Sequence, residues 1–328
     1  MRTPRIKVAP ELGEAAYHCM TRTVNGERLF TDLDKEVLRK QLWVVAEFCG
    51  LQIVTYQILS NHFHILVRVP KKIAIADEEL LRRYRLLHPR PTRYQTARLE
   101  VIESQLAANG PDAVAWRIRV SALMGDVSQY MKLLKQRFSI WFNKCHQRFG
   151  TLWSERFRSV LVEGKGEVLR TMAAYIDLNC VRAGLAGDPK DYRFGGYAEA
   201  VAGSSLARAG LGSVCGGGEW TETQLNYRQI LFGTGVRPRA KGGGVSVEAF
   251  ERVLEAGGKL ALADILRCRI RYFTHGAVLG GSAFVESQLA AYRIRTGRRN
   301  GIGPRALPAI ADWGDLAVLR KVRRAALG

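Results

Sequence analysis

Two histidines, His62 and His64, stand one residue apart in the stretch SNHFHILVRV. The rest of this stretch is typical of a buried strand, and side chains alternate between the two faces of a strand. Both imidazoles are therefore expected on one face, while Phe63, Ile65 and Val67 take the other, apolar face. Two neutral imidazoles at this spacing can bind one cation. The alternative is two unrelated surface histidines, because an HxH pair alone is not specific.

A second pair of residues that could take part in a reaction lies in the stretch AAYIDLN, where Tyr175 and Asn179 stand four residues apart. If this stretch is helical, the two side chains share one face. A phenol and an amide oxygen would then reach the same place above a sheet. Plainer interpretations also hold for each: most of the 11 tyrosines are expected to pack, and an asparagine near a helix end can serve the backbone.

The charge balance indicates a polyanionic partner. The 328 residues include 50 Lys and Arg against 30 Asp and Glu, a formal net charge of +20. Such a field favours nucleic acid or an anionic membrane surface. No apolar run reaches the roughly 18 residues needed to span a bilayer, and the N-terminal stretch lacks the apolar centre of a signal peptide. We therefore expect a nucleic-acid partner, no membrane, and a cytoplasmic, nucleoid-associated protein.

The six cysteines are scattered without a CxxC pair. This spacing predicts neither a disulfide framework nor a cysteine zinc site. A reducing compartment fits the pattern.

The order of the expected elements predicts the fold class. Strand patterns cover residues 15–23, two runs within 51–69, and 157–164, and helical patterns cover 31–50, 114–149 and 166–184. Strand, helix, strand, strand, helix, strand, helix is the order of a split βαββαβ sheet of the ferredoxin-like type with added helices. The sequence therefore predicts an α+β fold.

Composition shifts predict three parts of the chain. Residues 1–200 form the first domain, with a polar helical insertion at about 77–112. Residues 201–244 are rich in glycine and predict a linker region. Residues 245–328 predict a mainly helical, basic C-terminal domain, in which a helix-turn-helix and a plain helical bundle are equally compatible with the pattern. Its arginines favour a phosphate-contacting surface over a solvated face.

Several stretches together carry a family resemblance: YHCMTRTVNGERLF, SNHFHILVRV, RFGTLWSERFRSVLVE, AAYIDLNCVRAGL and DYRFGGY. Histidine, bulky apolar residue, histidine on a central strand of such a sheet is the HUH motif. The sequence resembles the IS200-like single-tyrosine HUH transposases, and within them the REP-associated tyrosine transposases, over about residues 15–200. Two departures are modest: Cys180 stands where the family commonly has proline, and YRFGGY replaces a YRWSSY-like form.

The resemblance implies that residues 1–200 are a catalytic domain with Tyr175 as nucleophile and with His62, His64 and Asn179 as ligands of a divalent metal, Mg²⁺ or Mn²⁺. Zinc would also suit two imidazoles. Attack of the tyrosine on a phosphodiester would give a 5′-phosphotyrosine link and a free 3′-hydroxyl. A second 3′-hydroxyl could then reverse the step without ATP. The implied substrate is single-stranded or hairpin DNA, and the implied assembly is a monomer or a homodimer.

Basic residues interleaved with aromatic ones predict the DNA contacts, because basic groups can follow phosphates while aromatic rings stack on bases. The candidates are Lys132, Lys135, Arg137, Arg148, Arg156 and Arg158. Core packing of the aromatic side chains is the alternative. Three other functions compete with a strand transferase: a domesticated hairpin-DNA-binding protein without turnover, a replication initiator or relaxase of the HUH class, and an RNA-binding ferredoxin-like module.

Overall fold

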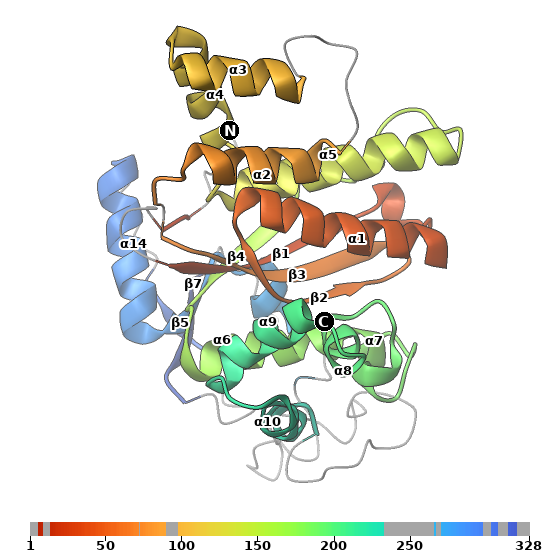
Figure 1. The fold of residues 1–328 in the computed structure, drawn as a ribbon. Helices are drawn as coiled ribbons and strands as arrows, with labels where there is room; N and C mark the ends of the chain where they lie inside the picture. The colour runs from red at the N-terminus through yellow and green to blue at the C-terminus, as the bar shows by residue number, and fades with distance from the viewer. Residues whose placement is uncertain are drawn as a thin grey trace, which may run out of the picture.

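A single mixed sheet forms the centre of the described structure, with helices on both of its faces (Figure 1). The computed structural model describes residues 6–8, 14–71, 73–89, 98–232, 266, 270–297, 303–307 and 314–319. The strand order is β2-β3-β1-β4-β5-β7-β6. The strands are β1 (Ala15–Arg22), β2 (Gln52–Ile58), β3 (His62–Val69), β4 (Arg158–Val162), β5 (Val278–Gly281), β6 (Arg305–Ala306) and β7 (Leu316–Leu319).

The α-helices of the described residues all follow strand β1 in the chain. They are α1 (Asp32–Cys49), α2 (Asp77–Leu87), α3 (Leu99–Ala108), α4 (Pro111–Ser121), α5 (Val127–Cys145), α6 (Gly166–Asp177), α7 (Asn179–Arg182), α8 (Gly196–Val201), α9 (Ser205–Cys215), α10 (Trp220–Phe232), α13 (Arg271–His275) and α14 (Ser282–Thr296).

The first four strands confirm the ferredoxin-like prediction. Their order is β2-β3-β1-β4, and each neighbouring pair is antiparallel. Helix α1 connects β1 to β2, and α5 precedes β4, which completes the split βαββαβ order. The register pairs Arg22 with His62 and Met20 with His64. The fold is therefore α+β, as the order of the sequence patterns predicted.

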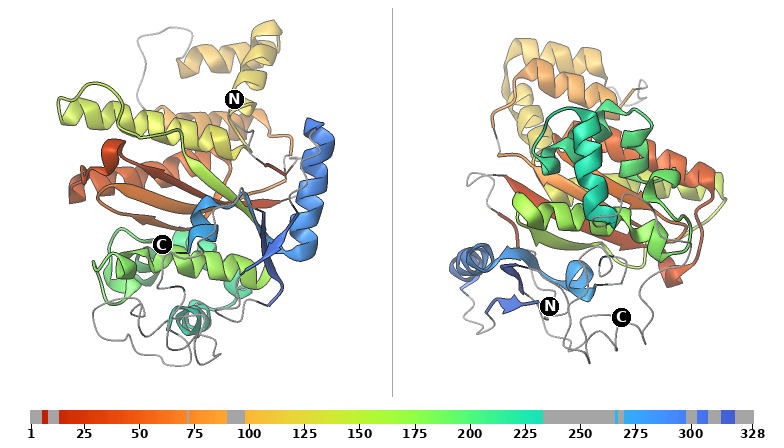
Figure 2. Two further views of the ribbon diagram at one scale, coloured as in Figure 1. Left: turned by 180° about the vertical axis from the view of Figure 1, so that it is seen from behind. Right: turned by 90° about the horizontal axis from the view of Figure 1, so that it is seen from below.

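The two faces of the sheet bury different side chains. Phe63, Ile65 and Val67 of β3 belong to one core, together with apolar residues of α1 and α5. Leu66 of the same strand belongs to a second core, together with apolar residues of α6, α9 and α10. The strict alternation along β3 thus separates an α1–α5 layer from an α6–α10 layer (Figure 2).

Local signals explain where the main helices begin and end. The Thr31 side chain accepts from the Asp34 backbone, and the Asp34 carboxylate accepts from the Thr31 backbone, which is a capping box at the start of α1. Gly50 ends α1 in the left-handed conformation. Gly125, also with positive φ, and Asp126, the N-cap of α5, divide the periodic stretch 114–149 into two helices. The arm consequently comprises α2, α3 and α4 and extends to Ser121, beyond the predicted limit near 112.

The predicted linker is wrong for residues 205–232. Helices α9 and α10 occupy this stretch, and α9 packs on β2 while α10 packs on α9 and α6. Leu211 and Leu231 are fully buried in the second core. Small residues predicted a flexible segment, but here they allow close approach of helix and sheet. Residues 233–244 lie outside the described residues.

Gly210 shows this close approach and carries a stability prediction. A Cβ at this position would lie under 3.0 Å from the backbone carbonyl oxygens of Ile53 and Val54. We expect Gly210→Ala to lower the free energy of unfolding by about 3 kcal/mol, because α9 must move off the β2 backbone. Gly212→Ala in the same helix meets nothing within 4 Å and should raise stability by about 0.5–1 kcal/mol. Urea unfolding of both variants checks the difference, and equal effects would contradict this packing.

The separate, mainly helical C-terminal domain is also wrong for the described residues. β5 pairs in parallel with β4, and β7 and β6 continue the same sheet. Helix α14 lies within the predicted helical domain and packs on β5 and β7. Residues 245–265 of the predicted helical domain lie outside the described residues. The alternating residues of short strands carry little periodic signal, which explains the missed extension.

No helix among the described residues is long and apolar enough to span a bilayer.

Candidate active site

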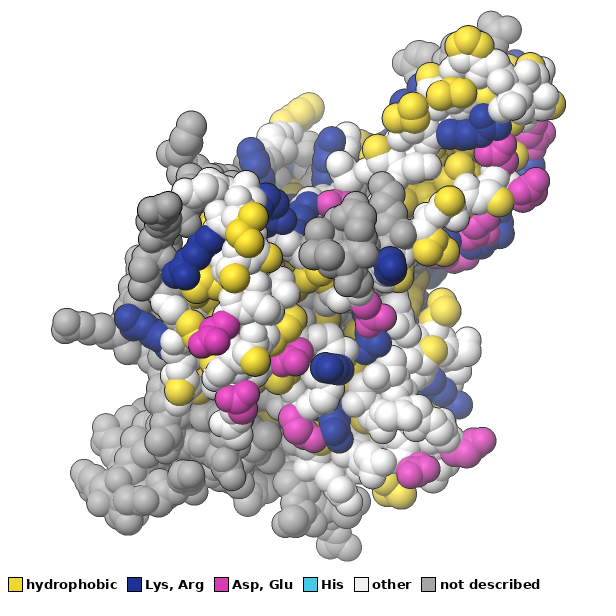
Figure 3. All heavy atoms as spheres, turned by 90° about the vertical axis from the view of Figure 1, so that its left-hand side faces the viewer, with side chains coloured by type: hydrophobic (Ala, Val, Ile, Leu, Met, Phe, Trp, Pro, Cys, Tyr) yellow, Lys and Arg dark blue, Asp and Glu magenta, His cyan; other side chains and the backbone are white. Residues whose placement is uncertain are grey.

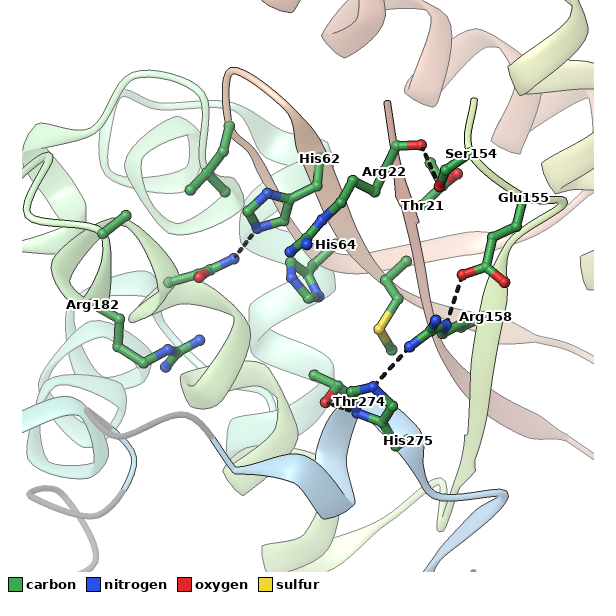
Figure 4. A pocket seen from close by; sticks show the side chains of 14 residues that line it. Thr21, Arg22, His62, His64, Ser154, Glu155, Arg158, Arg182, Thr274 and His275 are labelled. Atoms are coloured by element: carbon green, nitrogen blue, oxygen red, sulfur yellow. Dashed lines mark hydrogen bonds and ion pairs between the residues drawn. The ribbon is translucent and has the colours of Figure 1, made fainter. Parts of the chain in front are cut away.

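A cavity of about 370 Å³ opens on the face of the sheet opposite α1 and α5 (Figure 4). Five elements or their flanks line it: β1, β3, β4, α7 and α13. Its principal donors and cations are Arg22, His62, His64, Arg158, Asn179 and Arg182. Although Glu155 also lines the cavity and pairs with Arg158 at 2.7 Å, the two other guanidinium groups leave an excess of positive charge. Such a pocket is suited to an anionic ligand such as a phosphate group.

The two histidines project from the same face of β3, as the alternation predicted. Their ring centroids are 5.2 Å apart, with the planes at 82°. His62 is half-buried, and His64 is 8% exposed. Figure 4 shows both rings at one end of the cavity, beside the guanidinium group of Arg22. Both imidazoles therefore line the same cavity.

The hydrogen bonds of His62 orient its second nitrogen. Its Nδ1 lies 2.6 Å from Asn61 Oδ1, the neighbouring residue of the β2–β3 turn. An amide oxygen only accepts, so Nδ1 donates and Nε2 keeps its lone pair. That Nε2 lies 3.3 Å from the side-chain nitrogen of Asn179. His62 and Asn179 therefore meet across the cavity.

His64 makes its contact inside the core, with a histidine that the sequence did not single out. His64 Nδ1 lies 2.8 Å from Nε2 of His18 on β1. His18 Nδ1 in turn lies 2.8 Å from the backbone oxygen of Phe273. Burial lowers the pKa of His18 to about 4 and the pKa of His64 well below its usual value. Both rings are consequently neutral near pH 7, the form that can bind a metal.

Tyr175 lies on the same side of the sheet but not on the cavity wall. The residue is 2% exposed. Its ring is held between the Arg182 guanidinium, 4.0 Å from the ring centroid, and the Phe273 ring, whose centroid is 5.0 Å away. Its centroid is 6.4 Å from that of His18. Helix α6 ends at Asp177, and Asn179 begins the short helix α7. Of the predicted Tyr175–Asn179 pair, only Asn179 lines the cavity.

The same motif contains a buried carboxyl group that joins three elements. Asp177 of α6 accepts from the Thr55 hydroxyl of β2 at 2.7 Å and from the Tyr227 hydroxyl of α10 at 2.5 Å. Burial raises the pKa of Asp177 to about 7, against the lowering effect of these hydrogen bonds. This group positions α6, and with it Tyr175, between the sheet and α10.

We expect Asp177→Ala to lower the free energy of unfolding by about 2–4 kcal/mol. The change opens a cavity and leaves two buried hydroxyl groups without their acceptor. Asp177→Asn keeps the shape and one acceptor, so its loss should be less than half as large. Denaturant unfolding of the two variants measures this, and an Asp177→Ala loss below about 1 kcal/mol would contradict the anchoring role.

The sheet region that carries this site also carries a family signature. Residues 12–80, which include β1, α1, β2 and β3, match the family model described as Transposase IS200 like. The match covers His18, His62 and His64, and Tyr175 and Asn179 lie beyond it. It confirms, for these residues, the resemblance drawn from the sequence.

A solved structure of a REP-associated tyrosine transposase bound to a REP hairpin is similar at 14% sequence identity, with a TM-score of 0.40. The similarity covers 63% of this chain and 90% of that chain. No curated protein matches the sequence.

The six basic residues predicted to contact DNA are not gathered in one place. In the part of the chain that the structure describes, only Arg158 of the six lines the cavity. Lys135 is 8% exposed, and its Nζ donates to the Glu155 backbone oxygen at 2.6 Å, which makes it a structural residue. The remaining four are Lys132, Arg137, Arg148 and Arg156; Lys132 and Arg156 are exposed, and Arg137 and Arg148 are half-buried. On the side covered by α14, basic and acidic side chains are interspersed and the α2–α4 arm projects (Figure 3).

Four residues that line the cavity or contact its lining were not predicted from the sequence. His18 and Arg22 share one face of β1, as expected from the alternation of side chains in YHCMTR. Only the β1–β3 register shows that this face lies beside the histidine pair. Arg182 follows Asn179 by three residues in NCVR, and it donates to the Tyr175 backbone oxygen at 2.7 Å. His275 lies 2.7 Å from Arg158 through its Nε2. Because His275 lies 117 residues after Arg158, the sequence did not indicate that the two side chains meet.

The donor set that lines the cavity fits a divalent cation of mixed ligation. No three His, Cys, Asp or Glu side chains form a metal cluster within the described ranges. The candidate set is instead His62, His64 and the amide of Asn179. A half-turn of that amide would present its oxygen where its nitrogen now faces His62. Two imidazoles and one amide oxygen suit Mn²⁺ better than Mg²⁺, which prefers oxygen alone.

Proposed function

We propose that this protein is a DNA strand transferase that cleaves and rejoins single-stranded or hairpin DNA through a covalent bond to Tyr175. One observation supports the proposal above all: His62, His64 and Asn179 line one cavity with three arginines, on the sheet face against which Tyr175 packs. The IS200-like match of residues 12–80 supports the same chemistry. The net charge of +20 suits a nucleic acid.

In this proposal the cavity binds one phosphodiester group. His62, His64 and Asn179 would hold a divalent cation, which when bound polarises the non-bridging oxygens and neutralises their charge. Arg22 and Arg158 reach the same cavity from β1 and β4. Their guanidinium groups would orient the phosphate by charge-assisted hydrogen bonds. The neutral state of the buried His64 keeps its lone pair available.

Tyr175 would supply the nucleophile. Its oxygen forms a bond to phosphorus while the bond from phosphorus to the 3′ oxygen breaks, and the phenol proton leaves as the 3′-hydroxyl gains one. The result is a 5′-phosphotyrosine and a free 3′-hydroxyl. A phenol ordinarily ionises near pH 10, so the charge that develops on oxygen needs a cation nearby. The Arg182 guanidinium, which lies over the ring 4.0 Å from its centroid, would provide it in this proposal.

The buried position of Tyr175 adds a condition to this proposal. With Tyr175 2% exposed and its ring between Arg182 and Phe273, the phenol must turn toward the cavity before attack. The same burial is the observation that favours the alternative function, a hairpin-binding protein without turnover.

A covalent-adduct assay tests the proposal. The protein is incubated with single-stranded hairpin DNAs, labelled in turn at each end, with Mn²⁺, Mg²⁺ or EDTA, and is then run on denaturing gels. We expect an adduct that carries the 3′-side fragment, needs the divalent cation and disappears on protease treatment. Hairpin binding without any adduct, over a panel of hairpins and both metals, would reject the transferase and favour the non-catalytic binder.

A further inference from the structure

The buried pair His18 and His64 is a hydrogen-bond chain with a definite direction. It starts at the backbone oxygen of Phe273, which can only accept a hydrogen bond. His18 Nδ1, 2.8 Å away, must therefore carry the proton and donate it. In a neutral ring this leaves His18 Nε2 as an acceptor. His18 is fully buried, an environment that disfavours a charged ring.

The next link follows from the first. His18 Nε2 lies 2.8 Å from His64 Nδ1. Since His18 Nε2 accepts, His64 Nδ1 must donate, and His64 Nε2 is left without a proton. Metal-bound histidines usually donate their other ring nitrogen to a protein acceptor, which sets the tautomer and ring orientation. His18 stands in the place of that acceptor.

We infer that His18 is a positioning residue for the metal site, which accepts the Nδ1 proton of His64 and so presents the bare Nε2 of His64 as a ligand. The purpose of this arrangement rests on the proposed function, whereas the hydrogen-bond chain belongs to the metal-free protein. His18 itself has no free nitrogen for a metal, because both of its ring nitrogens are engaged. It acts through His64.

A parallel arrangement holds His62 by independent means. Asn61 Oδ1 takes the Nδ1 proton of His62 at 2.6 Å, so both histidines present Nε2. The two supports come from different elements: the β2–β3 turn for His62, and β1 with α13 for His64. His62 is thus an internal control for any change at His18. The chain also makes α13 part of the site, because its backbone carries the terminal acceptor.

The test reads the tautomers directly. Ring nitrogens of ¹⁵N-histidine-labelled, metal-free protein are observed by long-range proton–nitrogen correlation at neutral pH, and Mn²⁺ binding is followed by electron paramagnetic resonance. Three proteins are compared: wild type, His18→Gln, whose side-chain oxygen can replace the Nε2 acceptor, and His18→Leu, which has no acceptor. In the wild type we expect His64 to be protonated at Nδ1 and bare at Nε2.

The two variants should separate positioning from packing. His18→Leu is expected to shift His64 away from the Nδ1-protonated tautomer and to weaken Mn²⁺ binding about 10- to 100-fold, with His62 unchanged. His18→Gln should restore the His64 tautomer and stay within about 3-fold of wild-type affinity. If His18→Leu fails to fold, the wild type and His18→Gln still decide the matter.

Two results would overturn the inference: a wild-type His64 protonated at Nε2, or an unchanged His64 tautomer and Mn²⁺ affinity in a folded His18→Leu. Failure of the proposed function looks different. If the tautomers and Mn²⁺ affinities behave as expected and no hairpin gives an adduct, the strand-transfer proposal is rejected while the role of His18 stands.

Discussion

Tyr175→Phe should abolish the covalent protein–DNA adduct completely. The substitution removes the one oxygen that can bond to phosphorus in the proposed reaction, and no neighbouring side chain can replace it at the same position. The phenylalanine ring keeps the contacts with Arg182 and Phe273. We therefore expect hairpin affinity within about 3-fold of wild type and a stability change below about 1 kcal/mol. Denaturing gels, gel-shift titration and urea unfolding measure the three quantities.

The matched control is Tyr84→Phe, which changes a half-buried tyrosine of the α2 arm that contacts His88 and Trp116. It should form the adduct at the wild-type rate. An adduct that survives Tyr175→Phe would show that another residue is the nucleophile. Equal loss in both variants would point to a general defect of folding or binding.

His62→Ala should reduce metal-dependent cleavage by at least 100-fold and weaken Mn²⁺ binding at least 10-fold. The variant loses one of the two imidazole ligands, and a bound metal contributes several kcal/mol to the stabilisation of a phosphoryl transition state. His62 is half-buried at the end of β3, so the fold should tolerate the change better than a change at the more buried His64. Adduct formation over a range of Mn²⁺ concentrations gives both values.

His88→Ala is the control for this experiment, because His88 is exposed at the end of the α2 arm and does not line the cavity. It should match the wild type in rate and in Mn²⁺ dependence. If His62→Ala cleaves normally and needs the same Mn²⁺ concentration, His62 is not a metal ligand. Excess metal should rescue part of the His62→Ala rate, since His64 and Asn179 remain.

The chemistry of the site was predictable where it follows from local periodicity. Alternation along a strand decides that His62 and His64 share a face, whatever the strand packs against. The order of strands and helices was enough for the ferredoxin-like sheet, because sequential elements of this type have few ways to pair. Asn179 was predicted as a neighbour of the histidine pair through the family resemblance, and it does line the cavity with them.

Register and long-range pairing decided the rest. The sequence by itself determined which face of β3 carries the imidazoles, and that the chain is strongly basic. It did not determine that His18 lies against His64, because a shift of β1 by one residue would turn His18 into the opposite core. Only the folded chain brings Phe273, 255 residues away from His18, to the end of the same hydrogen-bond chain. Contacts over such separations depend on how all the strands of the sheet assemble. Short strands such as β5 and β7 contain too few residues for their pairing partners to be predicted from the sequence.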